Sequence, residues 1–457
     1  MARNRKPREV FELDEISVEI GHAVSKDGGL LAVTREIRRS GWFPALVDGM
    51  LEAMSGTDKP TLGFTVRAKL EAGLVALVAG LTLGRRNPNA IAQSFALDPL
   101  WLAVVGRSFG QKELSRLMAV LSEFGHEPLR KALLASALAG QTSLQLDLDS
   151  SLLELHGTQE LGAYNAHYHA FGYHAGWAVD VRTQRIAALW LNEGKANTAQ
   201  GQDEQMAWVL DQGADVSLAR FDAGLIGPKL LGAMAGRVER FVCRIRPNDT
   251  LARLADPIEP EGALYAGARA YGEIRYGAGS WTKDERVVVK FQAPDGAEGQ
   301  AALVAERFYF VTSLEDAPAD VVRTYQQRGE SERMFGEFVA TFQPTFRHAE
   351  VKKNEVWALL LGLAHNVLSD LREQLPKAGK PRRQRVEHRP AFLPDQWVFG
   401  YQRVLLDAMD TVRPLLARVR DMALRVPCEL RQRGRRLLLA VSPDILAPAW
   451  FPALMRA

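Results

Sequence analysis

SLQLDLD, at residues 143–149, alternates strictly between apolar and polar side chains. A period of two residues predicts a β-strand, because successive side chains of a strand point to opposite faces of the sheet. One face then holds Leu144, Leu146 and Leu148, and the other holds Gln145, Asp147 and Asp149. The sequence therefore predicts that a sheet begins here and that one of its faces is acidic.

The next hundred residues indicate strands mixed with helices. Aromatic and β-branched runs from Ala163 to Trp190, broken by glycines, predict a strand meander. Strands and helices then alternate, which is typical of a mixed α/β sheet. We expect a helix at 199–212, a strand at 216–221, a helix at 228–235 and a strand at 241–245.

The sequence patterns on either side of this region are different. Before residue 142, apolar residues recur at helical spacing, as in the stripe from Lys112 to Phe124, so the N-terminal part is predicted to be mostly helical. Short helices of this kind suit a DNA reader, although any small helical bundle has the same pattern. Residues 249–318 are rich in glycine and aromatic residues and predict an all-β segment. One long helical pattern runs from Pro318 to about Phe342, and a second helix is expected at 354–374.

Composition places the chain among globular proteins. It has 457 residues, of which 47% are hydrophobic and 24% charged, and this length suffices for two to four domains. Two cysteines cannot make a disulfide framework, which fits a reducing compartment. The most apolar run, residues 72–84, is shorter than the ~18–20 residues of a membrane span, and the first residues lack an apolar signal region. The sequence thus predicts a soluble intracellular protein.

Charge is distributed unevenly along the chain. Residues 371–457 hold 17 Lys and Arg against 8 Asp and Glu, so they carry +9, and residues 1–370 carry −6 because the whole chain carries +3. A basic region of this kind favours nucleic acid as a partner, and a solvated helical face would explain it equally well. Its densest cluster is Arg431, Arg433, Arg435 and Arg436. An apolar stripe at helical spacing predicts a packed helix in the same region, with Leu405, Met409, Val412, Leu416 and Val419.

Three acids fall where a sheet would expose them together. Asp149 is expected at the end of the first strand, Asp222 at the end of a later strand, and Glu332 inside the helix after Pro318. Ligand sites form at strand ends in α/β sheets, and converging carboxylates repel one another unless a cation lies between them. Oxygen ligands favour Mg²⁺ or Mn²⁺, and a pair of such ions activates water or a 3′-hydroxyl in phosphodiester chemistry. Each acid alone is more simply an ordinary surface or capping residue.

Neighbouring acids are rivals for two of these positions. Asp147 shares the strand face of Asp149 and is an alternative ligand. Glu330 lies about 200° around the helix from Glu332, so it is the less favoured of the two. We therefore retain Asp149 and Glu332, with Asp147 left open.

A zinc site is the other metal hypothesis for this region. The candidates are His167, His169 and His174. They lie in an aromatic strand region without partnering cysteines, so histidines on a strand surface are the favoured interpretation.

Two further residues accompany Glu332 on the predicted helix. Tyr325, Arg328 and Glu332 are spaced i, i+3 and i+7, which places them on one helical face. A tyrosine hydroxyl and a guanidinium beside a metal-binding carboxylate suit the phosphate backbone of DNA. Tyr325 and Arg328 are therefore predicted DNA contacts.

This spacing resembles the DDE transposases of bacterial insertion sequences, whose third catalytic residue lies in a Y-x2-R-x3-E-x6-K motif. The strand LDLDSS at 146–151 is similar to the family's strand ending in the first Asp, and RFDAGL at 220–225 to its second-Asp strand. HGTQE at 156–160, together with Tyr164 and Asn165, resembles the segment after the first strand in one subgroup. The resemblance covers roughly residues 60–375.

The resemblance implies an RNase H-like α/β mixed-sheet catalytic core with a β-rich insertion, because 110 positions separate Asp222 from Glu332. Asp149, Asp222 and Glu332 would hold two Mg²⁺ (or Mn²⁺) ions. One departure is Val339, which stands where the motif has lysine, so the backbone contact of that lysine is either missing or supplied elsewhere, by Lys352 or Lys353. The regions expected are a helical DNA-binding region at 1–140, the core at 141–248 and 319–375, the insertion at 249–318 and a basic helical tail at 376–457.

The function implied is that of a cut-and-paste transposase. Metal-activated water nicks each end of the element, and the freed 3′-hydroxyl attacks target DNA. Its partners would be double-stranded DNA, with terminal inverted repeats and target, and a second copy of the chain, in a bacterial cytoplasm near the nucleoid. Two alternatives remain, an inactive DNA-binding derivative and a nuclease of the same fold that does not rejoin ends.

Overall fold

The computed structural model describes residues 16–20, 25–55, 66–260, 264–265, 269–293, 301–302, 305–374, 416–424, 428–433 and 436–441. The chain folds as two units. We call residues 137–335 the sheet unit, and residues 1–136 together with 336–457 the helical unit. No helix in the described ranges is both long and apolar enough to span a membrane.

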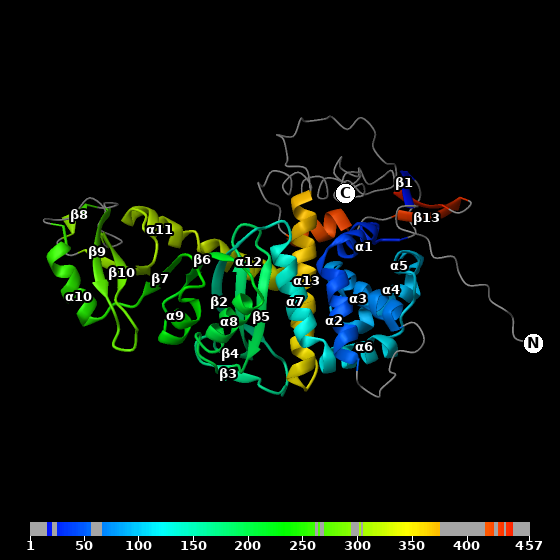
Figure 1. The fold of residues 1–457 in the computed structure, drawn as a ribbon. Coiled ribbons are helices and arrows are strands. Elements are labelled where there is room, and N and C mark those ends of the chain that lie inside the picture. Colours follow the sequence, from blue (N-terminus) through cyan, green and yellow to red (C-terminus); the bar gives the residue numbers. More distant parts are fainter. Residues whose placement is uncertain are drawn as a thin grey trace, which may run out of the picture. The chain divides into compact units, whose positions relative to one another are not determined.

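The sheet unit is built on a sheet that has nine strands in the described residues, in the order β3-β4-β2-β6-β7-β12-β10-β9 with β5 also paired to β4 (Figure 1). Its strands are β2 (Leu144–Glu154), β3 (Ala163–Asn165), β4 (Ala170–Asp180), β5 (Ile186–Asn192), β6 (Val216–Phe221), β7 (Phe241–Ile245), β9 (Arg269–Tyr276), β10 (Glu285–Gln292) and β12 (Glu306–Thr312). The shorter β8 (Leu264–Tyr265) and β11 (Ala301–Ala302) pair with each other.

Five of these strands form the predicted RNase H-like core. β5, β4 and β2 are antiparallel neighbours, and β2, β6 and β7 run parallel. The crossovers carry α8 (Gln202–Asp211) between β5 and β6 and α9 (Pro228–Met234) between β6 and β7. The strands expected at 216–221 and 241–245 are found with those bounds, so the alternation of the sequence located the core correctly.

The β-rich insertion continues the core sheet rather than standing beside it. β12 pairs antiparallel with β7, and β10 and β9 extend the same sheet. The segment opens with a helix, α10 (Asp249–Ala255), and a 3-10 turn (Asp256–Ile258), so it is not all-β as the sequence predicted. The helix forms because Asn248 caps it, with Oδ1 accepting the Leu251 N–H at 2.9 Å.

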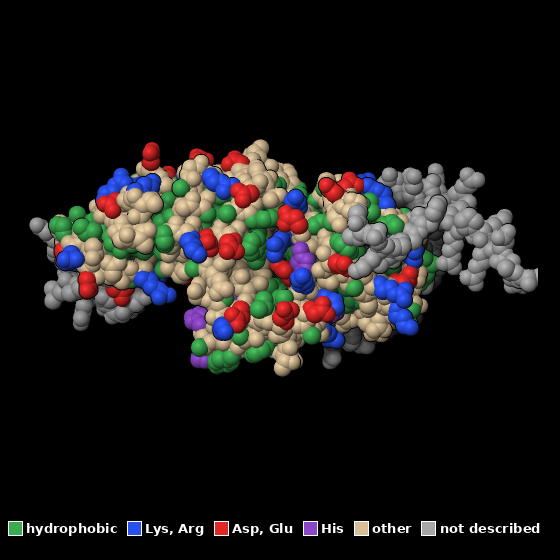
Figure 2. Space-filling view, turned by 60° about the horizontal axis from the view of Figure 1, so that its bottom comes forward, with side chains coloured by type: hydrophobic (Ala, Val, Ile, Leu, Met, Phe, Trp, Pro, Cys, Tyr) green, Lys and Arg blue, Asp and Glu red, His purple; other side chains and the backbone are tan. Residues whose placement is uncertain are grey.

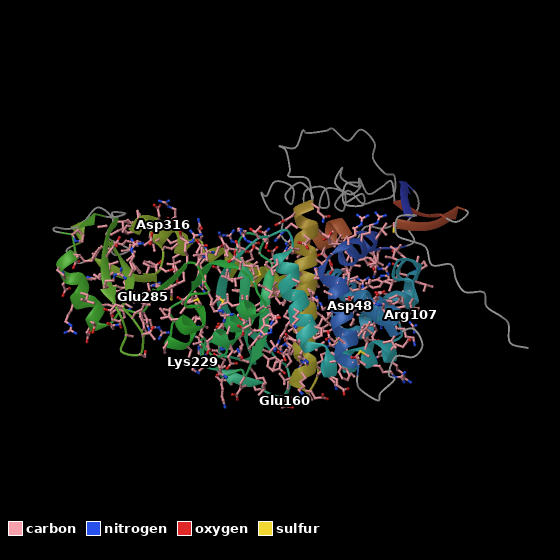
Figure 3. All side chains as sticks on the ribbon, in the orientation of Figure 1. Asp48, Arg107, Glu160, Lys229, Glu285 and Asp316 are labelled. Carbon is pink, nitrogen blue, oxygen red and sulfur yellow. The ribbon has the colours of Figure 1, made fainter. Side chains whose placement is uncertain are left out.

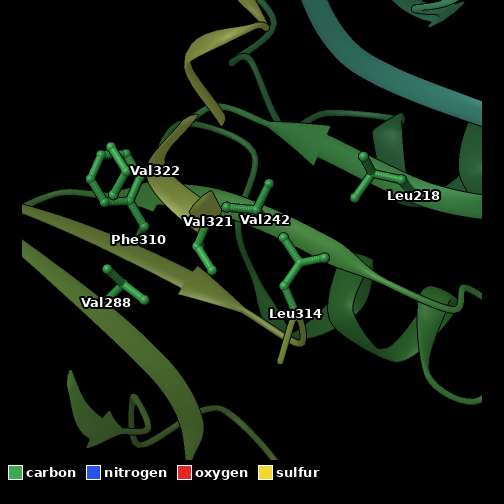
Figure 4. Packing of buried hydrophobic residues seen from close by; sticks show 7 residues of the cluster. All are labelled: Leu218, Val242, Val288, Phe310, Leu314, Val321 and Val322. Atoms are coloured by element: carbon green, nitrogen blue, oxygen red, sulfur yellow. The ribbon is translucent and has the colours of Figure 1, made fainter. Parts of the chain in front are cut away.

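An apolar cluster seats α11 (Pro318–Gln326) on this sheet (Figure 4). Val321 and Val322 of the helix are buried against side chains from the neighbouring parts of the sheet unit. The cluster comprises Leu218, Val242, Val288, Phe310, Leu314, Val321 and Val322. Tyr325, one turn further along α11, packs against its edge, so the cluster fixes where this side chain lies.

The long helix expected from Pro318 to Phe342 is interrupted. α11 ends at Gln326, and α12 (Gly329–Phe342) begins three residues later. The break precedes Gly329, a residue with weak helix propensity, and the next part of the chain is anchored separately because Phe335 packs on Trp177 with ring centroids 5.2 Å apart. The prediction that Tyr325, Arg328 and Glu332 share one helical face is therefore wrong.

The helical unit confirms the prediction that the N-terminal region is mostly helical. Its helices are α1 (Leu30–Arg39), α2 (Trp42–Met54), α3 (Val66–Thr82), α4 (Pro88–Leu97), α5 (Pro99–Val105), α6 (Gln111–Phe124), α7 (His126–Leu138) and α13 (Val351–Gln374). α13 is buried along most of its length and packs on α3 and α6. Its Asn366 donates to Ser136 Oγ at 2.7 Å, which ties α13 to α7.

The C-terminal segment is part of the helical unit. Leu416 and Val419 are buried where α15 (Leu416–Arg418) and a π-helix (Val419–Leu424) pack near α1 and α13, as the apolar stripe predicted. Leu405, Met409 and Val412 lie outside the described residues. Beyond this, the structure differs from the expected helical tail, because β13 (Cys428–Arg433) and β14 (Arg436–Val441) form an antiparallel hairpin. β14 also pairs parallel with β1 (Ile16–Ile20), a partner that local periodicity cannot reveal.

Gly29 offers a test of how this segment docks. A Cβ atom at Gly29 would lie 2.3 Å from Leu424 Cα and 2.7 Å from its carbonyl oxygen. Gly29→Ala should therefore displace residues 416–424, cost about 1–3 kcal/mol and speed tryptic cleavage at Arg420. Gly41→Ala is the matched control, because nothing lies within 4 Å of its added Cβ. Equal melting temperatures and equal cleavage rates for the two variants would contradict this docking.

Candidate active site

Two predicted acids lie side by side in the sheet unit. β2 and β6 run parallel with Leu148 opposite Phe221, so the next residues, Asp149 and Asp222, are neighbours across the two strands. Asp222 directly follows β6, as predicted. Asp149 does not end its strand, because β2 continues to Glu154 by pairing with β4 after its pairing with β6 stops. The expectation of a strand end is thus wrong for Asp149, although the two acids still converge.

Backbone amides hold both carboxylates. Asp149 Oδ1 accepts the N–H of Ser150 at 2.8 Å, and Asp222 Oδ1 accepts the N–H of Ala223 at 2.7 Å. Asp149 is partly buried, with 16% of its side chain exposed, whereas Asp222 is exposed. From α8, Gln202 Nε2 donates to the Asp149 carbonyl at 2.9 Å. The site therefore combines a carboxylate fixed in the sheet with one that faces solvent.

Arg328 provides a positive charge next to Asp149. Its Nη2 lies 2.8 Å from Asp149 Oδ2, and the Arg328 side chain is only 8% exposed. Burial lowers the pKa of Arg328, but the negative charges around it, above all Asp149 and also Asp222, outweigh burial and raise that pKa. Arg328 is thus held as a buried cation next to Asp149 and remains charged.

Tyr325 contacts the second acid. Its hydroxyl donates to Asp222 Oδ1 at 3.3 Å, and its ring meets that of Phe310 with centroids 5.1 Å apart. Burial and the charge of Asp222 both raise the pKa of Tyr325, so the hydroxyl stays protonated and keeps donating. The predicted DNA contacts Tyr325 and Arg328 therefore surround the acids, one on α11 and the other in the break after it.

Asp147, the rival to Asp149, belongs to a buried ion pair. Arg220 Nε and Nη2 lie 2.6 and 2.9 Å from its two carboxylate oxygens, and the exposed side-chain fractions are 0% for Asp147 and 1% for Arg220. Arg220 Nη1 also donates to the Thr324 carbonyl at 2.8 Å, which links β6 to α11. The sequence analysis did not identify this pair. The signal for it was Arg220, an arginine within the apolar strand that ends just before Asp222.

Glu332 lies in the first turns of α12, and the side chains of Glu330 and Glu332 are outside the described set. Among the described residues, no group of three or more His, Cys, Asp or Glu side chains is placed to hold a metal. Asp149 and Asp222 nevertheless fit a hard divalent ion, because their donors are carboxylate oxygens and the site already accommodates the cationic group of Arg328.

Of the three histidines of the zinc hypothesis, His167 and His169 are exposed in the turn between β3 and β4. His174 is buried, with Nδ1 2.6 Å from the Ala196 carbonyl oxygen, and burial lowers the pKa of His174. Its ring meets Tyr168, which in turn meets His167. His174 is therefore a buried, hydrogen-bonded histidine rather than the strand-surface histidine that the sequence predicted.

The remaining predicted residues lie elsewhere. Val339 on α12 is 44% exposed, and Lys353, a proposed substitute for the motif lysine, lies 2.7 Å from Glu350. Arg431 and Arg433 are in β13 and Arg436 begins β14, with side chains outside the described set, and Arg435 is outside the described residues altogether.

Surface charge does not mark a single DNA path on the face shown in Figure 2. There, Lys and Arg side chains are interspersed with Asp and Glu over the described residues. Lys229, in the first turn of α9, is an exposed cation that comes soon after Asp222 along the chain (Figure 3). The Lys and Arg side chains on this face are therefore not gathered into one basic patch.

Comparison with known proteins relates the chain to a protein family. The family model for the transposase DDE domain, group 1, matches residues 13–388, a range that includes Asp149, Asp222 and Glu332. No curated protein matches the chain. Among solved structures, the chain is similar to piggyBac transposase in a cryo-EM structure of its synaptic complex with hairpin DNA, with 11% identity and a TM-score of 0.44 over 74% of each chain.

Proposed function

The chain belongs to the transposase DDE domain group 1 family, and on this premise we propose that it cuts the ends of an insertion sequence and joins the freed 3′-hydroxyls to target DNA. The observation that carries the proposal is the pair of acids, Asp149 and Asp222, on adjacent parallel strands, with α12 carrying Glu332 in the same unit. This is the order of acids that a DDE site requires.

Asp149, Asp222 and Glu332 would hold two Mg²⁺ or Mn²⁺ ions. Bound there, such ions would supply an activated water or 3′-hydroxyl and stabilise the leaving oxygen of the phosphodiester. The protein's own groups fix the acids: Ser150 and Ala223 donate backbone N–H groups to them, and the Tyr325 hydroxyl orients Asp222.

Double-stranded DNA is the proposed partner. Tyr325 and Arg328 lie beside the acids, where the scissile phosphate would approach, and the hairpin arginines at 431–436 would contact DNA outside the core. Because both ends of an element must be joined in one event, we propose a homodimer on DNA. A location near the bacterial nucleoid remains a prediction from sequence.

One incubation separates transposition from the two alternatives. The purified chain is incubated with Mg²⁺ and a plasmid carrying the inverted repeats that flank its gene, and the products are sequenced. Integration supports the proposal, cleavage without joining indicates a nuclease, and binding without cleavage indicates an inactive derivative. The Asp149→Asn/Asp222→Asn double variant is the control, because it binds DNA with the same surface but lacks both aspartate ligands.

A further inference from the structure

The strongest unexplained feature of the site is that a cation of the protein already contacts one of the two acids. Arg328 Nη2 is 2.8 Å from Asp149 Oδ2, and the charges of Asp222 and Asp147 also act on this guanidinium. Asp149 thus has a counter-ion within the protein itself. A divalent ion bound by the same carboxylates would stand close to a like charge.

Arg328 belongs to neither of the two helices that flank it. It lies in the two-residue break between α11 and α12, so it is outside both helices. The flanking segments are anchored independently, α11 by Val321 and Val322 and α12 by the contact of Phe335 with Trp177. A rearrangement of residue 328 therefore leaves both anchors in place.

The neighbouring ion pair of Arg220 and Asp147 differs from the pair of Arg328 and Asp149. Arg220 grips Asp147 with two nitrogens, and neither side chain has more than 1% of its surface exposed. Arg328 contacts an acid that is 16% exposed, and the second acid, Asp222, faces solvent, from which a hydrated ion can arrive. The pair of Arg220 and Asp147 is thus shut off from solvent, whereas Arg328, itself 8% exposed, contacts an acid that solvent reaches.

We propose that Arg328 is a built-in counter-ion that competes with the divalent metal for Asp149, so that metal binding requires the guanidinium to leave. This inference rests on the proposed function, because it takes Asp149 and Asp222 as metal ligands. It makes Arg328 a positioning residue whose departure accompanies assembly of the site. Without metal the guanidinium prevents repulsion between the acids, and with metal it is displaced.

The test is Mn²⁺ binding to the full chain without DNA, measured by calorimetry. Arg328→Gln should bind Mn²⁺ about tenfold or more tightly than the wild type, because the competing charge is gone. Arg328→Lys keeps the charge and should stay closer to the wild type. Arg323→Gln is the matched control, since Arg323 is exposed on α11, lies 2.6 Å from Asp320 and should leave the affinity unchanged. In melting experiments, Arg328→Gln should be less stable than the wild type without metal and recover when Mn²⁺ is added.

Equal or weaker Mn²⁺ binding by Arg328→Gln would overturn the inference and mean that Arg328 supports the site. Failure of the proposed function looks different: the wild type and Asp149→Asn/Asp222→Asn would then bind Mn²⁺ alike. If Arg328→Gln does not fold with or without Mn²⁺, the arginine side-chain ¹⁵N spectrum of the wild type decides. A shift of the Arg328 signal on adding Mg²⁺ supports displacement, and an unchanged signal refutes it.

Discussion

Asp149→Asn and Asp222→Asn should each lower DNA strand cleavage by about a thousandfold or more, while binding to the DNA ends stays within about threefold of the wild type. Each change keeps the shape of the side chain and removes one negatively charged oxygen ligand. Both acids lie at the same point of the sheet, on β2 and directly after β6, so neither can replace the other. Glu332→Gln should have the same effect if α12 supplies the third ligand.

The assay is a gel that resolves nicked from intact end DNA, beside a mobility shift that reports binding. Asp211→Asn is the matched control, because Asp211 is an exposed acid of the same unit, 2.6 Å from Arg237 and outside the site. It should cleave at the wild-type rate. Near-normal cleavage by a variant at Asp149 would remove that residue from the site and reopen the case for Asp147.

The alternation of apolar residues located β2, in which Leu144, Leu146 and Leu148 are fully buried. It could not show that β2 runs on past Asp149, since that extension depends on pairing between residues 150–154 and β4. Pairing partners distant in sequence leave no local pattern. The parallel pairing of β1 with β14 was missed for the same reason.

The sequence predicted which of these residues lie close together, and only part of their geometry. The order of the acids and the Y-x2-R-x3-E spacing located Asp149, Asp222, Tyr325 and Arg328 in one neighbourhood, and the structure brings these four together. Helical periodicity continued through residues 327–328 in the sequence, so it concealed the break that lets Arg328 turn toward Asp149. The break follows α11, whose valines pack against the sheet, and precedes Gly329.

The ion pair with Arg220 distinguishes Asp147 from Asp149 as a candidate metal ligand. Arg220 and Asp147 are opposite each other on parallel strands, an arrangement visible only once the register is known. Both side chains are buried, so Asp147 is already neutralised by a bidentate partner inside the sheet unit. We therefore assign Asp147 a structural role and leave Asp149 as the proposed ligand.

Arg220→Met should destabilise the sheet unit by about 3–5 kcal/mol, because Asp147 would lose its bidentate partner inside a buried strand. Arg237→Met is the matched control: its pair with Asp211 is equally short at 2.6 Å but exposed, so the loss should stay below about 1 kcal/mol. Hydrogen exchange in urea, read on the amides of β2 and β6, measures the sheet unit separately from the helical unit.

The double variant Asp147→Leu/Arg220→Met separates a structural role of this pair from a catalytic one. Apolar side chains of similar size remove both charges together, so most of the stability lost in Arg220→Met should return. Because this pair is structural, the double variant should also retain cleavage, whereas an Asp147 that held the metal would lose it. A stable double variant without cleavage would therefore transfer the ligand role from Asp149 to Asp147.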